Sequence, residues 1–229
     1  MYSTNLKIQV NNKGKLIGKI YEDVKNKFEV EGEVFYEGFL SANRLSDAVD
    51  IIPFTISEKL LKAYDLTLTK DTEIAFGGEL RSYNRIIDGK SRLILSFFVK
   101  EILQDCENEN QTNELSLIGY VCKEPIYRKT PFEREICDIL IAVNRPNFNK
   151  SDYIPCIIWG RNARLMQNQK VGTKVNLFGR IQSRTYKKEI SEGVFEERTA
   201  YEVSCQRLSI EETNKEISPE EVGAYYKKR

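Results

Sequence analysis

The sequence predicts an all-β protein made of two tandem copies of one five-stranded Greek-key barrel, with a short helix between the third and fourth strands of each copy. Three observations support this prediction. Landmark residues recur at a nearly constant offset, each half of the chain is rich in strand-like segments, and each half has one helix-like segment at the same place. The 229 residues, 41% of them hydrophobic, allow two small packed cores.

The internal repeat defines the domains. Four landmarks return after 101 residues and one after 102, and the pairs are Gly18/Gly119, Arg44/Arg145, Gly78/Gly179, Ser82/Ser183 and Asp50/Asp152. Four landmarks at one spacing are hard to obtain by chance. We therefore expect barrels at residues 1–103 and 115–210, an acidic linker at 104–114 and a C-terminal tail at 211–229.

The elements of the second copy follow from composition. Strands rich in β-branched and aromatic residues are predicted at 115–121, 136–144, 153–159, 174–183 and 199–210, and a helix at 160–169. The first copy repeats this order with its helix at 60–66. The order is that of the OB-fold. Gly78, Gly119 and Gly179 are interpreted as strand glycines where a small barrel bends sharply.

The net charge of +1 conceals an uneven distribution. Residues 1–103 contain 15 basic and 15 acidic side chains, whereas residues 115–210 contain 16 and 10. The basic excess of the second copy is compatible with phosphate binding, although a solvated lysine face would give the same count.

Several classes of protein are excluded by what the sequence lacks. It has no histidine and its five cysteines never form CxxC, which argues against Ser-His or Cys-His catalysis and against a zinc site. We find no carboxylate pair or nucleotide-binding loop, so we expect no enzyme activity, no metal and no cofactor. The N-terminus lacks a signal peptide and no apolar run could span a membrane, so a cytoplasmic, nucleoid-associated location is expected.

Several motifs of the second copy carry a family resemblance. GYVCKEPIYRKTP, IAVNR, DYIPCIIWGRNA and GRIQSRTY resemble, in order and spacing, the bacterial single-stranded DNA-binding proteins over residues 115–210. The chain resembles a tandem OB-fold form of that family. The resemblance implies sequence-independent binding and protection of single-stranded DNA in replication, recombination and repair, without catalysis. It also implies four OB folds per assembly, hence a homodimer of this chain, with replication proteins as possible partners.

Binding a single strand requires cations along the phosphates and flat side chains on which bases stack. The resemblance places stacking aromatics at Tyr153, Trp159 and Tyr186, with Tyr127, Phe132 and Phe148 as weaker candidates. The cations that cluster around them in sequence are Arg128, Lys129, Arg145, Arg161, Arg184, Lys187 and Lys188.

Simpler interpretations exist for some of these residues. A lone strand tyrosine more often packs in a sheet than binds a base, and Tyr201 is interpreted as packing. Lys187 and Lys188 could form a solvated hairpin tip. We expect residues 185–199 to be a flexible loop laid against the bound strand.

The first copy and the C-terminus depart from the family pattern. Ile51 and Ser57 stand where the second copy has Tyr153 and Trp159, so weaker DNA contact and a role in assembly are expected for the first copy. The chain ends in SPEEVGAYYKKR rather than in an acidic tail with an apolar tip.

Two other functions fit the sequence. One is a primosome or phage-type accessory protein that uses its OB folds for protein contacts, and the other is an OB-fold RNA binder. Stacking and phosphate contacts suit DNA and RNA equally, so competition between oligo-dT and oligo-U would distinguish the two ligands.

Overall fold

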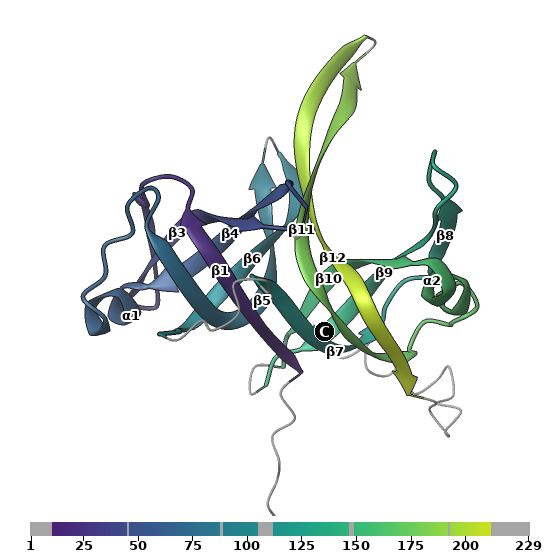
Figure 1. Cartoon of the computed structure of the whole chain (residues 1–229), viewed down its shortest axis with the longest axis horizontal. Helices are drawn as coiled ribbons and strands as arrows, with labels where there is room; N and C mark the ends of the chain where they lie inside the picture. Colours follow the sequence, from purple (N-terminus) through teal and green to yellow (C-terminus); the bar gives the residue numbers. More distant parts are fainter. Residues whose placement is uncertain are drawn as a thin grey trace, which may run out of the picture.

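The computed structural model describes residues 11–44, 46–87, 89–104, 112–146, 149–191 and 193–211, which form two barrels side by side (Figure 1). The predicted linker and tail therefore lie largely outside the described residues. The first barrel comprises β1 (Asn12–Ile20), β2 (Asn26–Val30), β3 (Glu33–Asn43), β4 (Val49–Ser57), α1 (Glu58–Ala63), β5 (Glu73–Ile87) and β6 (Lys90–Ile102). The second comprises β7 (Asn113–Val121), β8 (Ile126–Lys129), β9 (Glu135–Asn144), β10 (Ser151–Trp159), α2 (Gly160–Met166), β11 (Lys174–Ser191) and β12 (Val194–Glu211).

Each barrel closes with the predicted OB-fold order. In the first barrel, β1 pairs with both β3 and β5, and β4 and β6 close the cylinder as a parallel pair at Phe54 and Phe97. In the second barrel, β7 pairs with β9 and β11, and β10 runs parallel to β12 at Cys156 and Val203. The predicted fold class is confirmed.

Strand alternation and glycine bulges shape the barrels. Leu115, Leu117 and Val121 of β7 point into the core, whereas Ser116 and Tyr120 face outward. The register of β11 with β12 shifts between Phe178 and Gly179, and a Cβ on Gly179 would lie 2.2 Å from the Ser204 carbonyl oxygen. Only glycine allows this close approach, as expected for a sharply bent strand.

Both helices differ from their predicted bounds. Helix α1 begins two residues earlier than predicted because the Ser57 hydroxyl accepts a hydrogen bond from the Leu60 amide at 3.3 Å and caps it. Helix α2 ends three residues earlier than predicted, at Met166, and buries Ala163 and Met166 against its barrel. Neither helix is long and apolar enough to cross a bilayer, among the residues described.

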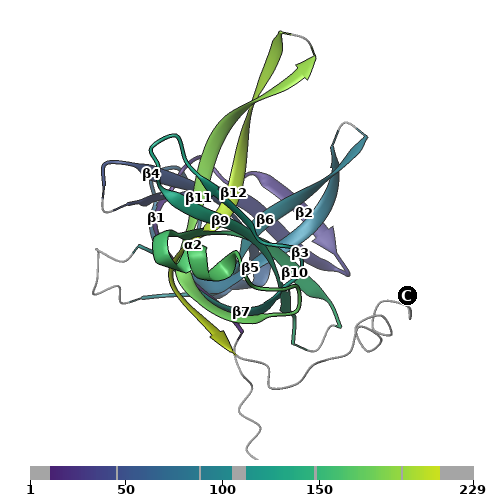
Figure 2. The same cartoon turned by 90° about the vertical axis from the view of Figure 1, so that its right-hand side faces the viewer.

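The segment 185–199 is not the expected loop. Strands β11 and β12 continue as a paired ribbon that projects away from both barrels (Figures 1 and 2). Lys187 and Lys188 lie opposite Glu197 and Glu196 across this ribbon. Cross-strand pairs of opposite charge stabilise a ladder that lacks an apolar face, so a polar composition does not imply a loop here.

The barrels are joined by antiparallel pairing of β1 with β7. Gly14 lies opposite Leu115, Asn12 opposite Leu117 and Leu16 opposite Asn113. At the 101-residue offset of the repeat, Gly14 corresponds to Leu115, Asn12 to Asn113 and Leu16 to Leu117. Exchanging the two copies therefore leaves the first pair unchanged and interchanges the other two. The two copies are thus related by an approximate two-fold axis through Gly14 and Leu115. The pairing yields a central sheet in the order β6-β5-β1-β7-β11-β12.

Candidate nucleic-acid interface

Strand β10 presents two of the three expected stacking residues. Its buried side chains, Ile154, Cys156 and Ile158, alternate with outward positions that include Tyr153 and Trp159. The Tyr153 side chain is 43% exposed. Trp159 is partly exposed, and its Nε1 donates a hydrogen bond to the Ser204 hydroxyl at 3.0 Å. The hydrogen bond fixes the edge of the indole ring.

The β11–β12 ribbon carries the third expected stacking residue, Tyr186. Tyr186 is 36% exposed, and the Arg184 guanidinium carbon lies 5.5 Å from the centre of its ring. Because strand side chains alternate, Arg184, Tyr186 and Lys188 share one face of β11, while Lys187 lies on the other. All four side chains are solvent-exposed. The ribbon therefore places an aromatic ring between two cations.

The two expected cations of the β8–β9 hairpin have carboxylate partners. Arg128 bonds Asp138 at 2.7 Å and Lys129 bonds Glu133 at 2.9 Å, both near the surface. The Tyr127 hydroxyl donates to Glu135 at 2.6 Å, and this bond raises the pKa of Tyr127. A phosphate would have to compete with these carboxylates. Arg161 is exposed at the start of α2, and Phe148 lies outside the described residues.

Arg145 has a different environment from the other expected cations. Its Nη2 and Nε bind the two oxygens of Asp152 at 2.6 and 3.0 Å, and Nη2 also donates to the Ser82 carbonyl oxygen of the first barrel at 2.9 Å. The guanidinium is engaged at the contact between the barrels. We therefore leave Arg145 out of the proposed DNA interface.

Two buried aspartates form this contact. Asp152 also accepts hydrogen bonds from Arg81 Nη1 at 3.0 Å and from the Ser82 amide at 2.6 Å. Its counterpart Asp50 accepts from Arg44, from Arg180 at 2.7 Å and from the Ser183 amide at 2.9 Å. Each carboxylate thus binds one arginine of its own barrel and one of the other.

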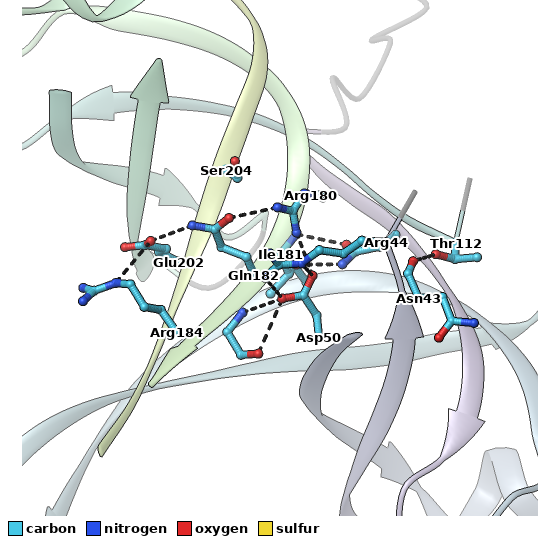
Figure 3. A network of polar contacts seen from close by, with 12 residues as sticks. Asn43, Arg44, Asp50, Thr112, Arg180, Ile181, Gln182, Arg184, Glu202 and Ser204 are labelled. Carbon is cyan, nitrogen blue, oxygen red and sulfur yellow. Dashed lines mark hydrogen bonds and ion pairs between the residues drawn. The ribbon is translucent and has the colours of Figure 1, made fainter. Parts of the chain in front are cut away.

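The Asp50 cluster continues toward the ribbon (Figure 3). Arg180 donates to Gln182 at 3.1 Å, Gln182 donates to Glu202 at 2.7 Å, and Arg184 lies 3.9 Å from Glu202. Burial lowers the pKa of Arg180, although the nearby Asp50 carboxylate opposes that shift. Polar contacts therefore connect the first barrel to the Arg184 and Tyr186 pair.

A groove of about 1080 Å³ lies between the first barrel and the β11–β12 ribbon. Tyr83, Tyr186, Tyr201 and Pro155 are among its lining residues. Its charged lining residues are balanced, with basic Lys25, Lys70, Arg85, Arg92 and Arg198 and acidic Glu22, Asp23, Glu37, Glu196 and Glu197. Sequence reasoning missed this groove because its walls come from segments nearly 180 residues apart.

Tyr83 is one of three aromatic residues that the first barrel contributes to the groove, with Phe39 and Phe54. Its hydroxyl donates to Glu37 at 3.0 Å, and Arg85 lies over its ring at 5.4 Å. Burial, followed by the bond to Glu37, raises the pKa of Tyr83 to about 12. Ile51 and Ser57 occupy the β4 positions that correspond to Tyr153 and Trp159 in β10, and Ser57 serves as the helix cap there.

None of the four cysteine thiols in the described ranges is activated, since the pKa of each is raised. Burial raises the pKa of Cys137 to about 11 and that of Cys205 to about 12, so both stay protonated at neutral pH. Within the described part of the chain, no three histidine, cysteine, aspartate or glutamate side chains gather where they could hold a metal ion.

The similarity to known protein sequences lies mainly in the second half of the chain. Residues 112–210 match the model of the Single-strand binding protein family. The chain is 35% identical over 89 residues to a Single-stranded DNA-binding protein of Oceanobacillus iheyensis, an alignment that covers 36% of this chain and 55% of the relative. It is 32% identical over 113 residues to Single-stranded DNA-binding protein 1 of Streptococcus agalactiae, covering 47% of this chain and 69% of that protein.

The curated relatives and the solved structures differ in how much of the chain they match. The chain spans little more than half the length of several curated relatives, 55% in the Oceanobacillus and Enterococcus faecalis proteins. The crystal structure of the single-stranded DNA binding protein from Thermus aquaticus matches 90% of this chain and 96% of its own, with a TM-score of 0.69 and 17% identity. That likeness supports the fold of both barrels.

Proposed function

Because this chain belongs to the single-strand binding protein family, we propose that it binds single-stranded DNA without sequence preference, through the second barrel. One observation carries the proposal. In the segment that matches the family model, the Tyr153 and Trp159 rings on β10 and the Tyr186 ring on β11 are all at least partly exposed. Each ring can stack a base for about 1 to 3 kcal/mol, and stacking tolerates any base.

The cations around these rings would bind the phosphates. Arg161, Arg184, Lys187 and Lys188 are exposed, and Arg128 and Lys129 would exchange carboxylate partners for phosphate. Such binding protects exposed strands during replication, recombination and repair, and we include replication proteins among the proposed partners.

Salt and strandedness test this proposal. We expect tight binding to oligo-dT, weaker binding to duplex of the same length, and an affinity that falls with salt as counterions are released. The slope of log affinity against log salt should be about −0.7 per phosphate neutralised. Fluorescence anisotropy of labelled oligonucleotides measures both quantities.

Equal affinity for duplex and single strand, or a slope near zero, would contradict the proposal. Competition with oligo-U of matched length distinguishes DNA from RNA, because an RNA binder would also use the 2′-hydroxyl and prefer oligo-U.

We also propose that two copies of the chain form a homodimer with four OB folds. The central sheet presents one broad outward face, on which Ile17, Ile118 and Phe178 are partly shielded from solvent. Arg207 covers the Phe178 ring at 4.3 Å. An outward face with a few apolar side chains suits an isologous two-fold contact.

Light scattering should therefore give twice the chain mass of 26.6 kDa at micromolar concentration. A charge in the contact should break it, so Ile118→Glu should give the single-chain mass. Ile190→Glu, on the ribbon and away from this face, should keep the doubled mass. A single-chain mass for the unmutated protein would exclude the homodimer.

A further inference from the structure

The first barrel contacts the backbone of an expected stacking residue in the second barrel. The Tyr153 amide donates a hydrogen bond to the Ser82 hydroxyl at 2.7 Å. Strand β10 pairs with β12 only at Cys156 and Ile157, so its edge at Tyr153 lies before that ladder begins. The Ser82 hydroxyl takes the place of a ladder partner and satisfies an amide that would otherwise lack one.

Ser82 is itself held firmly. Its side chain is buried, and its own amide donates to the Asp152 carboxylate at 2.6 Å. Arg81 and Arg145 bind the same carboxylate from the two sides of the contact. Residues 81 and 82 of the first barrel therefore clamp residues 152 and 153 of the second.

The counterpart position lacks this arrangement. The Ser183 hydroxyl lies 3.5 Å from an Asp50 oxygen, and the residue that corresponds to Tyr153 is Ile51. The hydroxyl-to-amide bond thus occurs where the expected base platform stands.

We propose that Ser82 is a positioning residue for Tyr153, so that the first barrel contributes to DNA affinity without touching the strand. The inference rests on the proposed function of Tyr153. Because the backbone of β10 is fixed, the exposed Tyr153 ring is held in one orientation before DNA binds. Stacking a base on the ring then costs less conformational entropy. This role explains how a charge-balanced barrel without the stacking rings remains useful for binding.

A double-mutant cycle with Tyr153 tests the proposal in the full-length chain. Ser82→Ala removes the hydroxyl and keeps the amide bond to Asp152, and it should weaken oligo-dT binding by about twofold to tenfold, the range of one hydrogen bond. In the Tyr153→Ala background, Ser82→Ala should have no further effect. Ser183→Ala is the matched control. Tyr153→Ala should lower the affinity for oligo-dT by the same factor in the Ser183→Ala background as in the otherwise unmutated chain.

Two further readouts separate positioning from loss of structure. Near-ultraviolet circular dichroism of Ser82→Ala should match the unmutated protein, and the quenching of Trp159 at saturating DNA should persist. Additive effects of Ser82→Ala and Tyr153→Ala would overturn the proposal, as would Tyr153→Ala without any loss of affinity. Failure of the proposed function would look different, because the unmutated chain itself would then not bind oligo-dT.

Discussion

Replacing Asp152 with alanine should lower the free energy of unfolding by about 3 to 5 kcal/mol, because in a buried contact it leaves Arg145 without its counter-ion and Arg81 with the Glu79 carboxylate alone. The Asp152 side chain is 0% exposed, and Arg81 and Arg145 are 16% and 25% exposed. The Ser82 amide also loses its acceptor. Urea denaturation followed by circular dichroism measures the change.

Asp138→Ala is the matched control for Asp152→Ala. Asp138 also binds an arginine, Arg128, at 2.7 Å, but both side chains are substantially exposed. A surface pair of this kind contributes at most about 1 kcal/mol. A similar small loss for both variants would show that the inter-barrel carboxylate does not stabilise the fold.

The two aspartates show how much the sequence could predict. The repeat identified Asp50 and Asp152 as equivalent landmarks, and the barrels followed from the same offset. The repeat also marks Arg44 and Arg145, which bind these aspartates within each barrel, but it does not mark the arginines of the opposite barrel, because Arg180 aligns with Glu79 and Arg81 with Gln182 at the 101-residue offset. The two halves place the second arginine at different positions of the same strand, so no repeat pattern marks it.

Arg145 illustrates the same point for the candidate site. A basic residue that follows a strand gives the same sequence pattern whether its partner is a phosphate or a buried carboxylate. Only the three-dimensional contact with Asp152 and Ser82 distinguishes the two. The β11–β12 ribbon is similar, since the pairing of Lys187 with Glu197 depends on a register that composition does not contain.

Trp159→Ala should weaken oligo-dT binding by about 1 to 3 kcal/mol, the contribution of one stacked base. In the unmutated protein, DNA should quench the indole fluorescence, because a nucleobase would stack on the ring. Trp159 is the only tryptophan of the chain, so no other residue contributes to the signal. Titration with oligo-dT under tryptophan excitation measures quenching, and anisotropy measures the affinity of the variant.

The alternative is that Trp159 is a core residue. In that case Trp159→Ala would cost about 3 to 5 kcal/mol of stability, and DNA would quench the fluorescence little. The partial exposure of the ring and its single edge bond to Ser204 favour the base platform. Tyr64→Ala, an exposed aromatic beside α1 in the first barrel, should leave the affinity unchanged. Large destabilisation of Trp159→Ala without quenching in the unmutated chain would assign the ring to packing and leave Tyr153 and Tyr186 as the platforms.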